Sequence, residues 1–145
     1  MSRVLARSDI ERILPHRDPF LFVDEIVELV PGKRIVGVVR IPETASILRG
    51  IPHHARRFPA TLLIEAMAQV GAILVLYAQE NRGRTIYFRA IEQARFHQDV
   101  QVGTTVRVAG DVRRLRGRLG TLAMKAFLAD APDACVAQGV MSFAL

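Results

Sequence analysis

The chain has 145 residues, half of them hydrophobic and 23% charged, and this composition is that of an ordinary globular protein with one domain and one core. Its formal net charge is +6, and arginine supplies nearly all of the basic residues. The arginines are not interleaved with aromatic side chains that could stack on bases, which argues against nucleic-acid binding and leaves either a solvated basic surface or attraction to an acidic partner.

The N-terminal segment carries neither the apolar core of a secretory signal nor a lipidation motif, so we expect a cytoplasmic protein. The single cysteine, Cys135, cannot form an internal disulfide or a cysteine metal cluster. It lies in an apolar run near the C-terminus, so we expect it to be a buried core residue rather than a nucleophile.

The N-terminal third predicts a short helix followed by a hairpin. Ser8 and Glu11 have the spacing of a capping box just before apolar residues, which predicts a helix that begins near Ser8 and ends before Pro15. The segment FLFVDEIVEL at 20–29 is rich in strand-forming residues, and a Pro-Gly-Lys turn separates it from a second such segment at 34–41. These two segments therefore predict a β-hairpin.

The segment from Pro59 to Glu80 predicts a long helix, because its composition is strongly helical and its proline suits the first helical turn. It is apolar on nearly every face, so it must be buried all round. Its length would cross a bilayer, but it contains Glu65 and Gln69 and is flanked by amphipathic strands. We therefore do not expect a membrane span.

Further strand-like runs follow the helix at 85–96, 104–115, 121–129 and 134–145, divided by turn signals. One long helix with five or six strands predicts an α+β domain over the whole chain. In this arrangement a curved antiparallel sheet wraps around the central helix at about 59–80, and a second copy covers what remains exposed. This is the hotdog fold, whose usual unit is a dimer.

Three motifs, in order and spacing, resemble the FabZ-type 3-hydroxyacyl-acyl-carrier-protein dehydratases. They are ILPHRDPFLFVDEIVEL at 13–29 with the PGKRIVG that follows it, LLIEAMAQVGAIL at 62–74, and YFRAIEQARFHQDVQVGTTV at 87–106. The resemblance covers nearly the whole chain. It implies a hotdog dimer with acyl tunnels at the subunit interface, an acyl thioester of acyl carrier protein as substrate, and neither a metal nor an organic cofactor.

The loop before the helix departs from this family. There the loop resembles GHFPGHPVMPG, and its first histidine works with the helix glutamate of the other subunit. Aligned without a gap, Glu65 falls on the family's glutamate, but Ile51 falls on its histidine. Isoleucine cannot accept a proton, so the base that would remove the proton alpha to the thioester carbonyl is missing from its place.

Four histidines occur elsewhere in the chain. His53 and His54 lie close in sequence to Ile51, which occupies the position of the family's histidine. A rearranged loop could bring one of them inward as a substitute base. The preferred interpretation is that they belong to a solvated or partner-facing loop. His16 is predicted to be a satisfied turn residue and His97 to be exposed at a strand end. Neither of these two is assigned to catalysis.

The remaining candidate residues flank the carboxylate. Arg56 and Arg57 are predicted to contact the acidic carrier protein. Ala60 and Thr61 begin the helix, whose backbone N–H groups are expected to polarise the thioester carbonyl. Gln69, one turn after the carboxylate on the same face, is placed beside the substrate and can hydrogen-bond to the carboxylate or to a loop.

Glu65 is interpreted as an acid/base group rather than a purely structural carboxylate, and three functions follow from it. The favoured one is a dehydratase subunit, inactive as a homodimer, that contributes Glu65 to a heterodimer with a histidine-bearing FabZ-like partner. The second is a homodimeric enzyme, either a dehydratase that uses His53 or His54 or a thioesterase that uses Glu65. The third is a non-catalytic module that binds acyl-carrier-protein thioesters.

Overall fold

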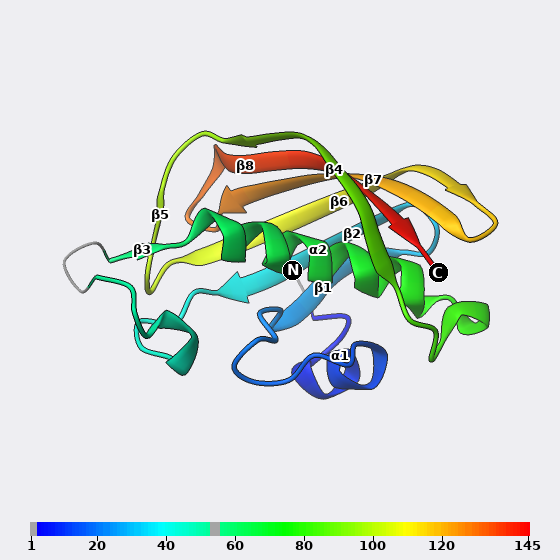
Figure 1. The fold of residues 1–145 in the computed structure, drawn as a ribbon, viewed down its shortest axis with the longest axis horizontal. Coiled ribbons are helices and arrows are strands. Elements are labelled where there is room, and N and C mark those ends of the chain that lie inside the picture. The colour runs from blue at the N-terminus through cyan, green and yellow to red at the C-terminus, as the bar shows by residue number, and fades with distance from the viewer. Residues whose placement is uncertain (1–2, 53–55) are drawn as a thin grey trace.

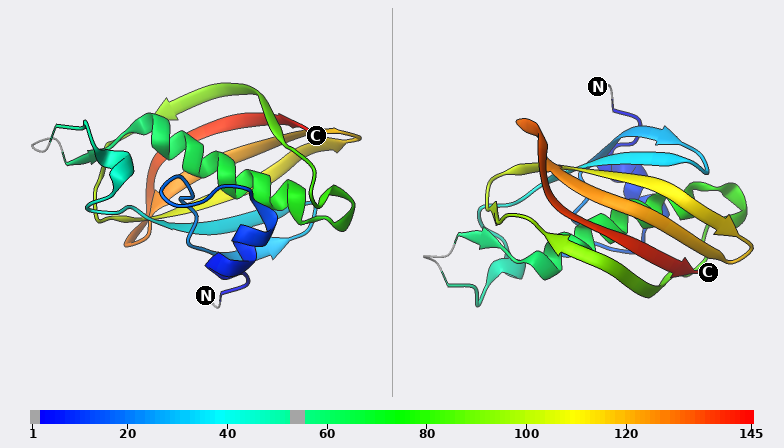
Figure 2. Two further views of the ribbon diagram at one scale, coloured as in Figure 1. Left: turned by 60° about the horizontal axis from the view of Figure 1, so that its bottom comes forward. Right: turned by 90° about the horizontal axis from the view of Figure 1, so that it is seen from above.

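The computed structural model describes residues 3–52 and 56–145. A long helix, α2 (Ala60–Tyr77), crosses the concave face of a curved sheet, and the two views of Figure 2 show the sheet bending around it (Figures 1 and 2). The strands of this sheet are β1 (Glu25–Val30), β2 (Arg34–Arg40), β4 (Tyr87–Phe96), β6 (Thr105–Arg116), β7 (Leu119–Leu128) and β8 (Ala131–Ala144). They lie in the order β1-β2-β6-β7-β8-β4, and every neighbouring pair is antiparallel.

The smaller elements lie outside this six-stranded sheet. They are the helix α1 (Arg7–Ile13), the short pair β3 (Arg57–Phe58) and β5 (Val100–Gln101), and the single 3-10 turns η1 (Ser46–Leu48) and η2 (Gln79–Asn81). A curved antiparallel sheet around one central helix is the hotdog fold, and the predicted α+β architecture is confirmed.

The central helix agrees with the prediction of 59–80, except that it ends at Tyr77 and continues as η2. Asn81 donates a hydrogen bond of 2.9 Å from Nδ2 to the carbonyl of Val75, which satisfies one of the acceptors left open at a helix C-terminus. The helix is long and apolar enough to cross a membrane, but 67% of it is buried within the fold. Such burial matches a core helix. The exception is its first turn, where Ala60 and Thr61 are exposed.

The first helix begins earlier than predicted. Its N-cap is Ala6, whose backbone N–H donates a 2.9 Å hydrogen bond to Oδ2 of Asp9. The capping box assigned to Ser8 and Glu11 is therefore wrong, because Asp9 supplies the capping carboxylate and Ser8 lies inside the first turn. The predicted end before Pro15 is confirmed, since α1 ends at Ile13.

The predicted strand at 20–29 forms only from Glu25 onward. Residues 21–23 are buried, and the hydrogen bonds of their backbone go to side chains and to the preceding turn, where the N–H of Leu21 donates to the carbonyl of Arg17 at 3.0 Å, and not to a neighbouring strand. The backbone N–H of Phe22 donates to Oε1 of Gln69 at 2.9 Å, and the carbonyl of Leu21 accepts from Arg7 Nη2 at 3.0 Å. The apolar run is thus an extended core segment that packs against α2, and not a ladder strand.

Cys135 lies in β8, and its burial differs from the prediction. Cys135 is half-buried rather than a full core residue, and its thiol lies 3.4 Å from the carbonyl oxygen of Ala137. The register between β7 and β8 shifts beside it, around Phe127, and this irregularity turns the cysteine partly outward. His97 follows β4 and is exposed, as predicted.

Candidate functional site

Glu65 lies in the second turn of α2, at the point where the helix passes from exposed to buried, and 25% of its side chain is accessible. It faces a pocket of about 170 Å³. The walls of this pocket are formed by His16, Glu65, Ala68, Gln69, Ala72, Ile86, Phe88 and Phe143. Apart from the side chains of His16, Glu65 and Gln69 the pocket is apolar, so the Glu65 carboxylate is partly shielded from bulk water.

Gln69 holds the carboxylate from one side. Its Nε2 donates to Oε1 of Glu65 at 3.0 Å and to the carbonyl of Phe20 at 2.8 Å, while its Oε1 accepts from the N–H of Phe22. Only 1% of Gln69 is exposed. Both predicted partners of this amide, the glutamate and a loop, are therefore present at once.

His16 approaches the same carboxylate, and sequence reasoning missed this. Its Nε2 lies 3.6 Å from Oε1 of Glu65, an ion-pair distance when the imidazole is protonated. Its ring stacks on Phe20, with 6.3 Å between the centroids. Its Nδ1 is buried and finds no hydrogen-bond partner among residues 3–52 and 56–145, so the expectation of a satisfied turn residue is wrong.

The turn that carries His16 is fixed by its neighbour. The guanidinium of Arg17 donates to the carbonyl of Leu14 at 2.9 Å, to that of His16 at 2.7 Å and to that of Glu11 at 2.9 Å. These bonds tie the turn to the end of α1 and point the imidazole toward α2. The only signal in the sequence was the membership of His16 in the motif at 13–29, which also contains the residues that bind Gln69.

A second ionic group anchors this segment to the sheet. Oδ2 of Asp24 accepts from the backbone N–H of Arg40 on β2 at 2.6 Å, and Oδ1 lies 3.4 Å from Nη1 of Arg7. Burial raises the pKa of Asp24, and the bonds from Arg40 and Arg7 oppose that rise without cancelling it. The segment that precedes β1 is thereby joined to both α1 and β2.

Ile51 lies in a different hollow from Glu65. It lines a pocket of about 160 Å³ together with Glu43, Thr44, Leu48, Pro52, Arg56, Arg57 and Val102. Among the described residues, none lines both this pocket and the pocket of Glu65. Within one chain Ile51 and Glu65 therefore face separate spaces.

The other predicted site residues do not join Glu65 in its pocket. Ala60 and Thr61 lie at the exposed start of α2 and are not part of the pocket wall. Nη1 of Arg57 forms a 3.0 Å ion pair with Asp99. Arg56 is exposed, with a positive φ of 46°. His53 and His54 lie outside the described residues.

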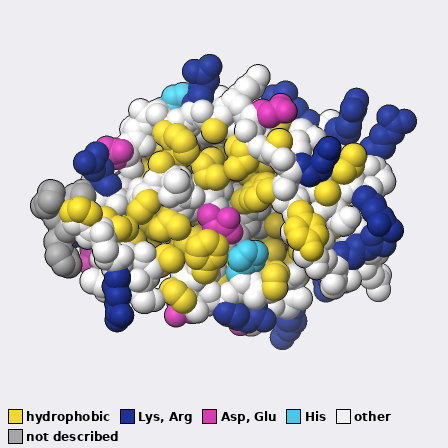
Figure 3. Space-filling model, in the orientation of Figure 1, with side chains coloured by type: hydrophobic (Ala, Val, Ile, Leu, Met, Phe, Trp, Pro, Cys, Tyr) yellow, Lys and Arg dark blue, Asp and Glu magenta, His cyan; other side chains and the backbone are white. Residues whose placement is uncertain are grey.

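The face that carries α2 and β4 is largely hydrophobic, with the lysine and arginine side chains around its edges (Figure 3). Strand β4 is an edge strand of the sheet, and it exposes Tyr87, Phe88, Ile91 and Phe96. An apolar edge of this kind is open to pairing with another chain. Within residues 3–52 and 56–145, no three His, Cys, Asp or Glu side chains come together as ligands for a metal.

Comparison with known proteins places this geometry in a family. Residues 14–139 match the model of the FabA-like domain. The chain is 41% identical over 111 residues to the 3-hydroxyacyl-acyl-carrier-protein dehydratase FabZ of Geobacillus thermodenitrificans, and 42% identical over 112 residues to that of Bacillus thuringiensis. Each of these alignments covers 77% of both chains.

Solved structures of low sequence identity share the fold. The dehydratase heterocomplex ApeI:P from Xenorhabdus doucetiae superposes with a TM-score of 0.76 at 13% identity, over 93% of this chain and 89% of the other. The PaaI protein of E. coli, from the phenylacetic acid degradation operon, superposes with a TM-score of 0.63 at 13% identity, over 83% and 81% of the two chains.

Proposed function

Because the chain belongs to the FabA-like family and is similar to FabZ dehydratases, we propose that it is a dehydratase subunit that acts on 3-hydroxyacyl thioesters of acyl carrier protein. Its place would be fatty-acid or polyketide-type biosynthesis in the cytoplasm. The exposed apolar edge of β4 supports a dimer, which is typical of the family. The chemistry needs proton transfers alone, so no cofactor is part of the proposal.

The observation that carries this proposal is the separation of Glu65 from Ile51. The two positions face different pockets of one chain, which supports a site that combines Glu65 of one chain with the Ile51 position of another across a dimer. In a homodimer of this chain each such site pairs a glutamate with an isoleucine, and it lacks a base at the position of Ile51. His16 is assigned to orienting Glu65, on the same chain. In a heterodimer with a histidine-bearing FabZ-like subunit, Glu65 completes one site. The dehydratase heterocomplex ApeI:P, which has the same fold, supports this arrangement.

The proposed reaction divides the two proton transfers between the subunits. The partner's histidine removes the proton alpha to the thioester carbonyl, while N–H groups in the first turn of α2 stabilise the negative charge that develops on the carbonyl oxygen. Glu65, or a water that it holds, protonates the hydroxyl on the beta carbon. The carbon–oxygen bond breaks, water leaves, and the enoyl thioester remains. Gln69 and His16 orient the carboxylate for this step.

The test is to incubate the purified chain alone with a short 3-hydroxyacyl carrier-protein thioester and to follow the products by mass spectrometry, with Glu65→Gln as control. No enoyl product is expected. Enoyl product that the control abolishes would show that another residue of this chain replaces the missing base. Release of the free carrier thiol without enoyl product would identify a thioesterase instead. Saturable carrier binding with no product in any pairing would leave only a binding module.

A further inference from the structure

A second and much larger cavity lies further along α2. Its volume is about 810 Å³, within the usual range of ligand cavities, whereas the pocket of Glu65 at about 170 Å³ is below that range. Its walls come from the C-terminal end of α2, from η2, from the β1–β2 turn and from the β6–β7 hairpin. In the part of the chain that the structure describes, Phe143 is the one residue that lines both spaces.

Phe143 separates the two spaces as a partition. It projects from β8 toward α2 with 2% of its surface exposed, and its ring stacks on Phe88 with 4.8 Å between centroids. On α2 the ring lies against Gly71, where an added Cβ would come within 3.2 Å of its Cζ. Ala72 lines the pocket of Glu65, and Leu74, half a turn further along the helix, lines the large cavity. The ring therefore stands at the boundary between them.

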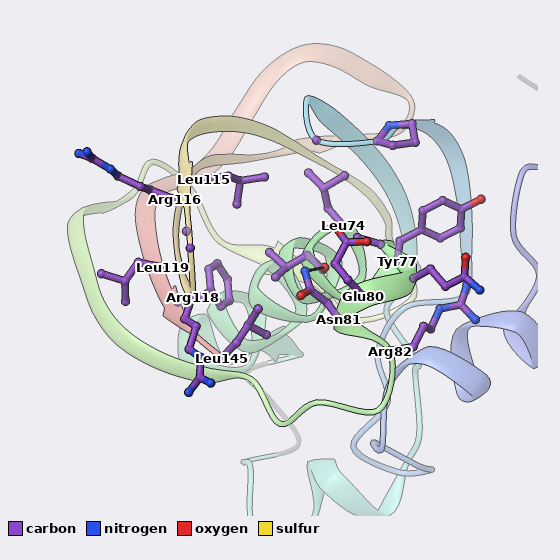
Figure 4. Close-up of a pocket in the computed structure, with 18 residues that line it drawn as sticks. Leu74, Tyr77, Glu80, Asn81, Arg82, Leu115, Arg116, Arg118, Leu119 and Leu145 are labelled. Carbon is purple, nitrogen blue, oxygen red and sulfur yellow. Dashed lines mark hydrogen bonds between the residues drawn. The ribbon is translucent and has the colours of Figure 1, made fainter.

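The large cavity has a mixed lining. Figure 4 shows apolar side chains on two sides of the space, Leu119 and Leu145 on one and Leu74 and Tyr77 across from them, while Glu80, Asn81, Arg82, Arg116 and Arg118 supply polar and charged groups around it. The leucines offer an acyl chain apolar contacts. From Ala72 to Ala78, which lines the cavity, α2 rises by about 9 Å. An acyl chain that extends from Glu65 along the helix would meet Phe143 first and could enter the cavity only past its ring.

We propose that Phe143 limits the length of the acyl chain that this subunit accepts, by closing the pocket of Glu65 against the large cavity. This inference rests on the proposed function. Short acyl groups end against the ring, and longer ones are excluded. Removal of the ring joins the two spaces and admits a longer chain. Phe143 is thus a residue of specificity and takes no part in proton transfer.

Binding, rather than turnover, tests this proposal, because the homodimer is proposed to be inactive. The affinities of butyryl, hexanoyl, octanoyl and decanoyl acyl carrier protein, all without a 3-hydroxyl group, are measured for the native chain and for Phe143→Ala and Phe143→Leu. Thermal unfolding followed by circular dichroism verifies that each variant is folded, and the leucine variant preserves an apolar side chain should the alanine variant unfold. We expect the native chain to prefer the shorter groups by about tenfold, and both variants to lose that preference.

A double variant separates the cavity from a general loosening of the fold. Ala78→Phe places a ring in the large cavity, which Ala78 lines, and leaves the pocket of Glu65 untouched, so in the Phe143→Ala background it should shift the preference back toward short chains. The same length profile in the native chain and in the Phe143 variants would overturn the role of Phe143 and leave the proposed function standing. Failure of every protein to bind any acyl carrier thioester would overturn both.

Discussion

The side-chain amide of Gln69 donates a 3.0 Å hydrogen bond to the carboxylate of Glu65, one turn earlier on α2. The same amide is held from its other side by the backbone of Phe20 and Phe22. The position of the carboxylate therefore depends on an extended segment far away in the sequence. The turn that contains His16 lies directly before that segment in the chain.

Substitution of Gln69 by leucine is expected to destabilise the protein strongly. Leucine has a similar size but leaves the N–H of Phe22 and the carbonyl of Phe20 without partners in the core, which lowers the free energy of unfolding by about 3 kcal/mol. Urea denaturation followed by circular dichroism measures this change. Gln69→Glu separates the two kinds of bond: it keeps the acceptor for Phe22 but loses both donated bonds and places a second carboxyl group against Glu65, so it should also be less stable than the native chain. A leucine variant as stable as the native chain would show that these hydrogen bonds contribute nothing.

The sequence predicts those parts of the fold that depend on local pattern. The central helix, the hairpin of β1 and β2, and the strands β6 to β8 follow from composition, alternation and turn residues. The segment at 20–24 is predicted to be a strand, and this is wrong. Its backbone is held by Gln69, which lies 47 positions from Phe22, and no local sequence pattern encodes such a contact. Tertiary hydrogen bonds outweighed strand propensity there.

The candidate site divides in the same way. Glu65 and Gln69 lie four positions apart on one helix, so their contact follows from helical spacing. His16 reaches Glu65 only because Arg17 fastens its turn to α1, and the separation of Ile51 from Glu65 arises from the path of the loop before α2. Such long-range relations require the three-dimensional structure.

His16 is expected to act as a positioning residue for Glu65. His16→Phe keeps an aromatic ring against Phe20 but removes both nitrogens, so a heterodimer with a histidine-bearing partner should lose kcat by about tenfold with little change in KM. A kcat equal to that of the native heterodimer would assign His16 to packing alone.

Asp24 is expected to make stability depend on pH. Burial raises its pKa above the ordinary value of 3.8, so between the two values the folded chain binds more protons than the unfolded one. The free energy of unfolding therefore falls as the pH rises from 3.8 through the raised pKa, and it levels off above that window. Asp24→Asn lacks this titration. Urea denaturation at a series of pH values should give curves that diverge over the window, and parallel curves would contradict the expectation.

Arg56 is expected to contribute to binding of the acidic carrier protein. It is exposed and forms no ion pair with the other described residues, whereas Arg57 is engaged by Asp99. Asparagine tolerates the positive φ at this position, so Arg56→Asn removes the charge without adding backbone strain. Carrier affinity should fall about fivefold at low salt and less at high salt. Arg12→Asn, on the exposed side of α1, is the control and should leave the affinity unchanged.

The most direct measurement of the central claim is complementation between two proteins, each of which the proposal predicts to be inactive alone. A FabZ-type homodimer whose helix glutamate is replaced by glutamine keeps its histidine but lacks the acid, and on the proposal the present chain supplies Glu65 but no histidine at the position of Ile51. The two are co-expressed, the heterodimer is identified by native mass spectrometry, and enoyl product from a 3-hydroxyacyl carrier-protein thioester is followed. We predict product from the heterodimer, none from either parent, and a loss of at least about a hundredfold when Glu65 is replaced by glutamine. A heterodimer that forms and yields no product would contradict the claim that Glu65 completes a site across the interface.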